Sequence, residues 1–175
     1  MLSVDFECCG GGGIAFVERD KVAKISEELG NLLNVVVDVD GETALPYDYP
    51  GEEWQDVWER ELGMANKLCE NGLMFVGLLP EADYHLDLSL GKIEAEEMET
   101  GLIEVTGSPI LIVEAGELIQ KIGNPGIDME IIGEIAVEPG IYSIQCSQDH
   151  LEEDRLIVGI SPAAGMTQVE NVVEL

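Results

Sequence analysis

The sequence predicts an α+β fold dominated by β-structure, with a mixed or antiparallel sheet and one long amphipathic helix. Most apolar stretches are short and end at Gly, Pro or acidic residues, which is typical of strands. Residues 52–70 instead carry apolar side chains at helical spacing. The length of 175 residues suits one domain, so we expect residues 1–175 to form a single compact domain.

The first predicted elements are two short strands and a helix. Residues 2–6 and 14–17 are apolar stretches around the glycine run 10–13, which predicts a strand, a hairpin turn and a second strand. A helical pattern follows from Arg19, and Gly30 stands where a helix C-terminus is expected. Residues 32–39 are rich in β-branched residues and predict a buried strand.

The middle of the chain begins with the clearest predicted helix, residues 52–70, whose first turn carries two acids that suit the helix dipole. Residues 73–79 predict a buried strand that ends at Pro80. Residues 84–90 alternate, which predicts a strand with Tyr84 and Leu90 at the ends of its buried face.

The remainder of the chain predicts mainly further strands. Gly116 to Ile122 predicts no more than a short helical turn, and Pro139-Gly140 predicts a turn between the two strands that flank it. The predicted strands are residues 92–98, 102–105, 110–113, 129–137, 141–146 and 156–160.

Two stretches of the chain resemble each other at a constant separation. Residues 11–18 and 107–114 each read as a small-residue turn, an apolar strand and a Glu, followed by a helical pattern. One interpretation is an internal duplication of a β-β-α unit, with pseudo-repeat halves at residues 1–90 and 91–175. The other is chance similarity between two common strand–helix connections.

The charge balance is extreme for a chain this apolar. Eight Lys and Arg oppose 36 Asp and Glu, giving a formal net charge of −28, yet 46% of the residues are hydrophobic and the mean hydropathy is +0.12. Disordered acidic chains are poor in apolar residues, so we expect a folded core. The shortage of basic residues argues against nucleic acid or an anionic membrane as partner.

The N-terminus and the cysteines indicate a cytoplasmic protein. Residues 1–7 lack a basic region and already carry two acids, which is unlike a secretory signal, and no apolar run reaches membrane-spanning length. Cys8, Cys9, Cys69 and Cys146 form no CxxC pair and have no histidine at ligand spacing. We expect reduced thiols, buried as small apolar side chains, and neither a zinc site nor a cofactor.

Three candidate catalytic patterns are each incomplete. The glycine run 10–13 precedes a strand rather than a helix and has no Gly-Lys-Ser/Thr, so a phosphate loop is disfavoured. Asp38 and Asp40 resemble the start of a calcium loop, but the twelfth position is Tyr49. His85 and Asp87 share a strand face, yet no recognisable nucleophile accompanies them. We therefore expect a protein that is not an enzyme, with a cation-dependent hydrolase using Asp38 and Asp40 as the alternative.

Dense acidic patches are the most informative functional feature. Such patches suit fast binding to a basic protein, as in inhibitors that block the phosphate-binding face of a nuclease. Plain solubility is the competing interpretation, and adaptation to high salt is disfavoured because Glu outnumbers Asp. A third acidic run lies at residues 152–154. The predicted partner-binding residues are Glu94, Glu96, Glu97 and Glu99 in one patch and Asp48, Glu52, Glu53 and Asp56 in another.

Parts of the sequence resemble a known group of proteins. Residues 12–18 (GGIAFVE) and 106–113 (TGSPILIV) are similar to the strand motif of small acidic immunity proteins that neutralise bacterial polymorphic toxins. Residues 135–144 resemble that group's hairpin of an apolar strand, a Pro/Gly turn and a Tyr-bearing strand. The expected Gly-Gly-Pro is replaced by Gly-Gly-Gly and Gly-Ser-Pro, so no binding residue is carried over. The resemblance implies a cytoplasmic bacterial antitoxin that contacts its cognate toxin directly.

Overall fold

The computed structural model describes residues 1–8, 13–34, 73–95, 97–123, 125–126, 128–148, 154–163 and 172–174. The predicted class is confirmed, because the described residues form a mixed α+β fold in which strands dominate. The helices are α1 (Arg19–Asn34) and α3 (Ala115–Gly123). The strands are β1 (Leu2–Cys8), β2 (Gly13–Glu18), β3 (Met74–Leu78), β4 (Ala82–Leu90), β5 (Glu99–Val105), β6 (Ile110–Glu114), β7 (Ile131–Ile135), β8 (Gly140–Gln148), β9 (Arg155–Pro162) and β10 (Val172–Glu174).

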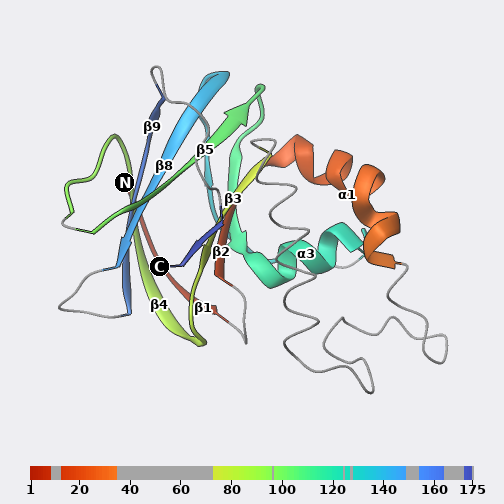
Figure 1. Cartoon of the computed structure of the whole chain (residues 1–175), viewed down its shortest axis with the longest axis horizontal. Helices are drawn as coiled ribbons and strands as arrows, with labels where there is room; N and C mark the ends of the chain where they lie inside the picture. Colours follow the sequence, from red (N-terminus) through yellow and green to blue (C-terminus); the bar gives the residue numbers. More distant parts are fainter. Residues whose placement is uncertain are drawn as a thin grey trace.

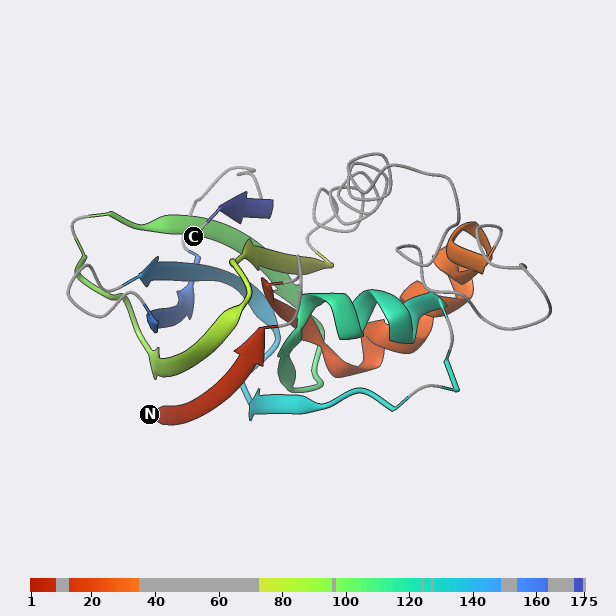
Figure 2. The ribbon, with the colours of Figure 1, turned by 90° about the horizontal axis from the view of Figure 1, so that it is seen from below.

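Two five-stranded sheets and the helices form three layers (Figure 1). Sheet A has the strand order β1-β4-β9-β8-β5, and sheet B has the order β10-β3-β2-β6-β7. Most neighbours are antiparallel, whereas β4–β9 and β3–β10 are parallel. Figure 2 shows α1 and α3 side by side on one side of the strands. Sheet B is therefore the middle layer, and the outer face of sheet A points away from the helices.

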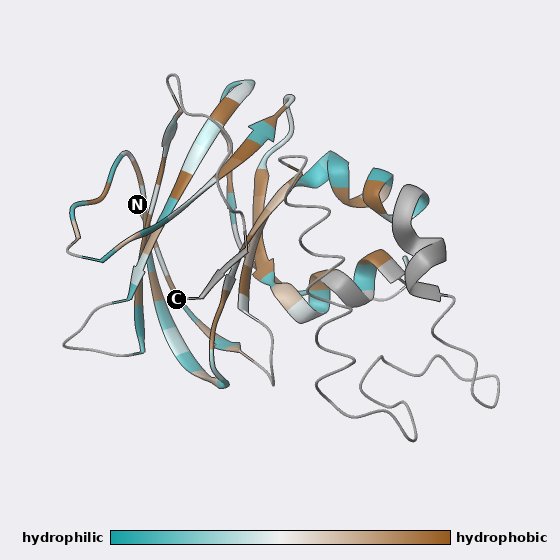
Figure 3. Cartoon of the chain, in the orientation of Figure 1, coloured by the Kyte–Doolittle hydropathy of each residue, from teal (hydrophilic) through white to brown (hydrophobic). Residues whose placement is uncertain are grey.

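The position of each strand in these layers explains its hydrophobic pattern. Residues of β2 and β6 are buried without interruption, because one set of alternate side chains faces sheet A and the other faces the helices. Ile14 and Phe16 belong to the core between the sheets, whereas Ala15 and Val17 belong to the core under the helices. Only one face of β4 is buried, so this strand alternates between apolar and polar residues (Figure 3).

The two similar stretches of the sequence lie next to each other in sheet B. β2 pairs antiparallel with β6, and each strand leads directly into a helix, α1 or α3. Glu18, at the end of β2, accepts hydrogen bonds from the backbone of the turn before β6. Glu114, at the end of β6, accepts one from the Gly13 amide at the start of β2. The Glu that ends each stretch therefore accepts hydrogen bonds from the backbone at the start of the other stretch.

The strand order has the symmetry that a duplicated unit would produce. When β1 to β4 are matched with β5 to β8 in order, the pair β1–β4 of sheet A corresponds to β5–β8, and the pair β2–β3 of sheet B corresponds to β6–β7. β9 and β10 have no counterpart in this correspondence. The predicted boundary between the halves at residue 90 stays a prediction.

Two predicted hairpins are wrong, because the strands on either side of each turn join different sheets. β1 pairs with β4 in sheet A, whereas β2 pairs with β3 and β6 in sheet B. Likewise, β7 pairs with β6, whereas β8 pairs with β5 and β9. A Gly- or Pro-containing connection breaks a strand, but it does not determine whether the chain pairs with the strand it has just left or crosses to the opposite sheet.

Several predicted boundaries also need correction. α1 continues through Gly30 to Asn34, so residues 32–34 are helical rather than part of a strand. α3 is a nine-residue helix and not merely a turn. The described residues between 92 and 98 form no strand, because this segment lies across sheet A as a loop. Leu90 ends β4 at 63% exposure, although its alternation predicted a buried side chain. The predicted helix at residues 52–70 lies outside the described residues.

Candidate functional site on the outer face of sheet A

Alternation along β1 and β4 gathers polar and charged side chains on the outer face of sheet A. Phe6, Tyr84, Leu86 and Leu88 point into the core, so the residues between them point outward. The antiparallel register then places Ser3 opposite Asp87, Asp5 opposite His85 and Glu7 opposite Asp83. We call the residues Ser3, Asp5, Glu7, Asp83, His85 and Asp87 the β1–β4 polar stripe.

Hydrogen bonds link five side chains at one end of this stripe. His85 Nδ1 lies 2.6 Å from Asp5 Oδ1, and His85 Nε2 lies 2.9 Å from Ser3 Oγ. Ser3 Oγ donates to Asp87 Oδ1 at 2.8 Å. Arg155 on β9 donates to Asp87 Oδ2 from Nε at 3.0 Å and from an Nη at 2.6 Å. The chain of contacts therefore runs from Asp5 through the imidazole and the hydroxyl to the Asp87–Arg155 ion pair.

The order of donors in this chain fixes the charge on His85. A carboxylate only accepts hydrogen bonds, so His85 Nδ1 must carry a proton toward Asp5. Ser3 donates its single hydroxyl proton to the hydrogen bond with Asp87, so its contact with His85 Nε2 is a hydrogen bond only if Nε2 is protonated and donates to Ser3 Oγ. The imidazole is then doubly protonated, and the hydrogen bond to Asp5 raises the pKa of His85 above its ordinary value despite a smaller opposing effect of desolvation.

The Ser3–His85–Asp5 distances resemble those of a hydrolytic triad, but the protons are in the wrong places for one. A triad histidine must accept the proton of the serine, and an imidazolium cannot. Ser3 instead donates a hydrogen bond to Asp87, and the pKa of Asp87 is held below its ordinary range by the Arg155 hydrogen bond first and that of Ser3 second. The arrangement stabilises charge and pins two strands together.

The other end of the stripe concentrates negative charge. Glu7 and Asp83 lie directly opposite on β1 and β4, and both are exposed. Glu81, just before β4, is exposed as well. Like charges facing each other across two strands destabilise the sheet, so this surface has a local excess of negative charge that a cation can relieve.

Two residues of the predicted acidic patch, Glu94 and Glu97, lie on the described part of the loop between β4 and β5, which crosses the same outer face, and Glu99 begins β5. The Ile93 amide donates to Gln145 Oε1 at 3.3 Å, and Ser147 Oγ donates to the Glu97 carbonyl at 2.7 Å. Gly159 allows the close approach, since a Cβ there would lie 2.6 Å from the Gly91 carbonyl oxygen. The loop is therefore attached to β8 and packed over β9, with exposed acids on it.

The structure places only part of the predicted site. Glu94, Glu97 and Glu99 are exposed on or beside the β4–β5 loop, which is an exposed position of the kind the prediction requires. Asp154, from the third acidic run, is exposed before β9. The described residues do not include Glu96, Asp48, Glu52, Glu53, Asp56, Asp38 or Asp40, so those predictions stay predictions.

Sequence reasoning placed His85 and Asp87 on one strand face but missed Ser3, Asp5, Glu7 and Asp83 of the β1–β4 polar stripe. The signal was present as alternation, because Ser3, Asp5 and Glu7 occupy every second position, as do Asp83, His85 and Asp87. What the sequence did not provide was the pairing of β1 with β4, whose residues are separated by about eighty positions.

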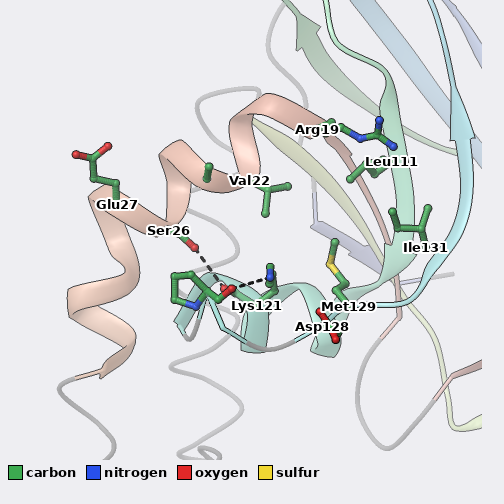
Figure 4. A pocket seen from close by; sticks show the side chains of 11 residues that line it. Arg19, Val22, Ser26, Glu27, Leu111, Lys121, Asp128, Met129 and Ile131 are labelled. Atoms are coloured by element: carbon green, nitrogen blue, oxygen red, sulfur yellow. Dashed lines mark hydrogen bonds between the residues drawn. The ribbon is translucent and has the colours of Figure 1, made fainter.

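A pocket of about 660 Å³ opens between α1, α3 and the segment before β7 (Figure 4). Val22, Leu111, Met129 and Ile131 give it an apolar wall. Its two cationic side chains have partners within the chain: Arg19 pairs with Glu134, and Lys121 donates to the Pro125 carbonyl at 2.7 Å. The pocket is suited to apolar groups and is remote from the outer face of sheet A.

Within the residues that the structure describes, no group of three or more His, Cys, Asp or Glu side chains is arranged to hold a metal ion. Cys8 and Cys146 are buried thiols, and burial raises the pKa of the Cys146 thiol. Neither α1 nor α3 has the length and apolar composition needed to span a bilayer.

The described fold and site define a two-sheet α+β protein with an acidic outer face. No family model matches the sequence, and no curated protein does either. A solved structure of ComJ from Bacillus subtilis, an inhibitor of the DNA-degrading activity of NucA, has a TM-score of 0.46 and 13% identity over 93% of this chain and 96% of its own. The structure of crocagin biosynthetic gene J has a TM-score of 0.39 and 9% identity over 93% of this chain and 98% of its own. At these values neither similarity assigns a family or a function.

Proposed function

We propose that this chain is a non-catalytic acidic protein-binding module that inhibits a basic protein, such as a nuclease toxin, by covering its active face. The observation that carries the proposal is the outer face of sheet A. It presents the opposed acids Glu7 and Asp83 and the exposed acids of the attached β4–β5 loop on one surface. A bacterial immunity protein would use such a face for its cognate toxin.

The electrostatics of this face favour a basic partner. Among the described cations, Arg155 pairs with Asp87, Arg19 pairs with Glu134, and Lys21 lies within 4 Å of both Glu18 and Glu104. Lys92 is exposed on the β4–β5 loop, but the acids of this face and the net charge of −28 far outweigh it. An excess of this size speeds diffusional encounter with a basic surface and disfavours acidic or nucleic-acid partners.

The attached loop favours tight as well as fast binding. A loop that must be ordered during association loses conformational entropy in the complex, whereas a loop already held by the Gln145 and Ser147 side chains loses less. The acids Glu94, Glu97 and Glu99 would then contact the partner without prior rearrangement. In this proposal, inhibition needs neither a cofactor nor a chemical step.

Capture from a nuclease-treated lysate of the native host tests the proposal when three forms of the chain are compared. The first is wild type, and the second replaces Glu94, Glu97 and Glu99 with Lys. The third replaces Glu27, Asp128 and Glu130, three exposed acids of the helical side, with Lys. The second and third forms have the same net charge, so they differ only in where the charge is changed.

The expected result is one basic protein retained in stoichiometric amount at high salt by wild type and by the helical-side variant, and lost by the loop variant. Binding that is equal in all three forms would remove the loop from the proposal. A mixture of basic proteins that all dissociate at high salt would show that the acidity serves only nonspecific attraction or solubility.

A further inference from the structure

Strand β1 lies at the edge of sheet A and pairs only with β4 within the described strands. Besides its backbone pairing, the first half of β1 is held to β4 by three side-chain contacts, from Asp5 to His85 and from Ser3 to both His85 and Asp87. These contacts are on the exposed face, where the side chain of His85 is 43% exposed and that of Asp5 is 90% exposed. Protons from solvent can therefore reach the imidazole directly.

We propose that protonated His85 is a pH-sensitive latch that holds the edge strand β1 on β4 and releases its first residues when the imidazole loses a proton. The proposal rests on the geometry of one hydroxyl between two partners. Ser3 Oγ lies 2.9 Å from His85 Nε2 and 2.8 Å from Asp87 Oδ1. With Nε2 protonated, Ser3 accepts from the imidazole and donates to the carboxylate, and both contacts are hydrogen bonds.

Loss of the proton leaves more acceptors than donors. Nδ1 keeps its proton because it faces the Asp5 carboxylate, so Nε2 becomes an acceptor. Ser3 then has one proton for two acceptors, Nε2 and Asp87 Oδ1, and one of its two contacts fails. Arg155 holds Asp87 from β9, so Ser3 on the edge strand is the group that is free to move.

The charges around His85 act in the same direction. From β1 it faces Asp5 with Glu7 beyond, from β4 it faces Asp87 with Asp83 beyond, and from β9 the Arg155 guanidinium opposes its positive charge. The protonated ring is the positive centre between Asp5 and Asp87, which come from different strands. Neutral His85 leaves these two carboxylates without that cation, so the pairing of residues 2–5 with β4 weakens.

The direction of the pH effect follows from the raised pKa of His85. A group whose pKa is higher in the folded state contributes stability below its unfolded pKa, and that contribution is lost as pH rises through the folded value. The latch is therefore closed at acidic pH and opens as pH rises through the raised pKa of His85, on the alkaline side of the ordinary histidine pKa. This behaviour needs no binding partner and is independent of the proposed inhibitory function.

NMR on the full chain tests the latch by following the His85 ring signals and the amide exchange of residues 2–5 through the same pH range. Exchange is expressed as a protection factor, the ratio of the intrinsic rate at each pH to the measured rate. As the ring loses its proton, protection of residues 2–5 should fall about threefold, the change that losing one weak hydrogen bond produces. Amides of the central strand β9 are the internal control and should not follow the titration.

Two variants separate the latch from a general loss of stability. Ser3→Ala keeps the Asp5 contact, so His85 should still titrate above its ordinary pKa, but protection of residues 2–5 should change less across the titration than in wild type, because only the charge effect remains. Asp5→Asn should lower the pKa of His85 and shift the loss of protection to lower pH by the same amount. Equal protection of residues 2–5 on both sides of the titration in wild type, or a His85 pKa at or below its ordinary value, would overturn the proposal.

Discussion

Replacing Glu18 tests how the two halves of sheet B are joined. The Glu18 side chain is fully buried, and its Oε1 accepts hydrogen bonds from the amides of Thr106, Gly107 and Ser108 at 2.7–2.8 Å. Its Oε2 accepts from Thr106 Oγ at 2.9 Å and lies 3.6 Å from Lys21 Nζ. One carboxylate on β2 therefore holds the whole turn that leads into β6.

The expected cost follows from the number of donors left without an acceptor. Glu18→Ala removes the acceptor of three backbone amides, and hydrogen bonds to charged groups contribute about 1.5–3 kcal/mol each. The turn is exposed enough for water to replace part of these contacts, so we expect a loss of about 3 kcal/mol in the free energy of unfolding. Glu18→Gln retains Oε1 for the amides and can donate to Thr106 Oγ, so it should cost about half as much, since neutral hydrogen bonds are weaker.

Urea unfolding followed by circular dichroism measures both changes, provided that the m-value stays constant. The Gln variant is the matched control because it preserves the shape of the side chain. Values for both variants within about 0.5 kcal/mol of wild type would refute the reasoning, because the turn would then be held by contacts other than this carboxylate. An equal, large loss in both would show that charge matters and that the number of acceptors does not.

Three further outcomes are expected. Burial raises the pKa of Glu18, but the hydrogen bonds from Ser108, Thr106 and Gly107 outweigh it, so the pKa of Glu18 is lowered in the folded protein. The stability that this carboxylate contributes should therefore be lost as pH falls through its folded pKa, and the decline of stability at acidic pH should be less steep in Glu18→Gln. Gly13→Ala should destabilise strongly in thermal unfolding, because Gly13 has a φ of +154° and a Cβ there would lie 2.2 Å from the Gly77 carbonyl oxygen, whereas Gly140→Ala, with its nearest neighbour at 3.6 Å, should cost far less. Gly159→Ala should push the β4–β5 loop away from sheet A, seen as faster amide exchange of Ile93, and unchanged exchange there would show that the loop is not held by this contact.

Most strands could be predicted because their patterns are local. The alternation of β4 and the continuous apolar stretches of β3 and β6 each depend on a few neighbouring residues. Their partners could not be predicted, since pairing depends on residues far apart in the chain. The two wrong hairpins show this, because the breaks were recognised correctly and the crossings between sheets were not.

The same limit applies to the site. The acidic run around Glu94 was recognised because its members are neighbours in the sequence. The β1–β4 polar stripe was not, because Asp5 and His85 become neighbours only when β1 pairs with β4. The segment from residue 92 to 98 alternates like a strand, yet its described residues, 92–95 and 97–98, cross the sheet as a loop. The two neighbours of β4 are β1 and β9, and the side chains of Gln145 and Ser147 hydrogen-bond the loop backbone instead. Tertiary contacts therefore override the strand propensity that the local alternation predicts.

The central claim, that the outer face of sheet A binds a basic protein, is tested most directly by the rate of association as a function of salt. The captured partner is mixed with wild type, with the Glu94, Glu97 and Glu99→Lys variant, and with the equally charged helical-side variant. We expect a rate that falls steeply with ionic strength for wild type and the helical-side variant, and a slower, less salt-dependent rate for the loop variant. Identical salt dependence for the two variants would contradict the claim, because only the net charge of the molecule would then matter.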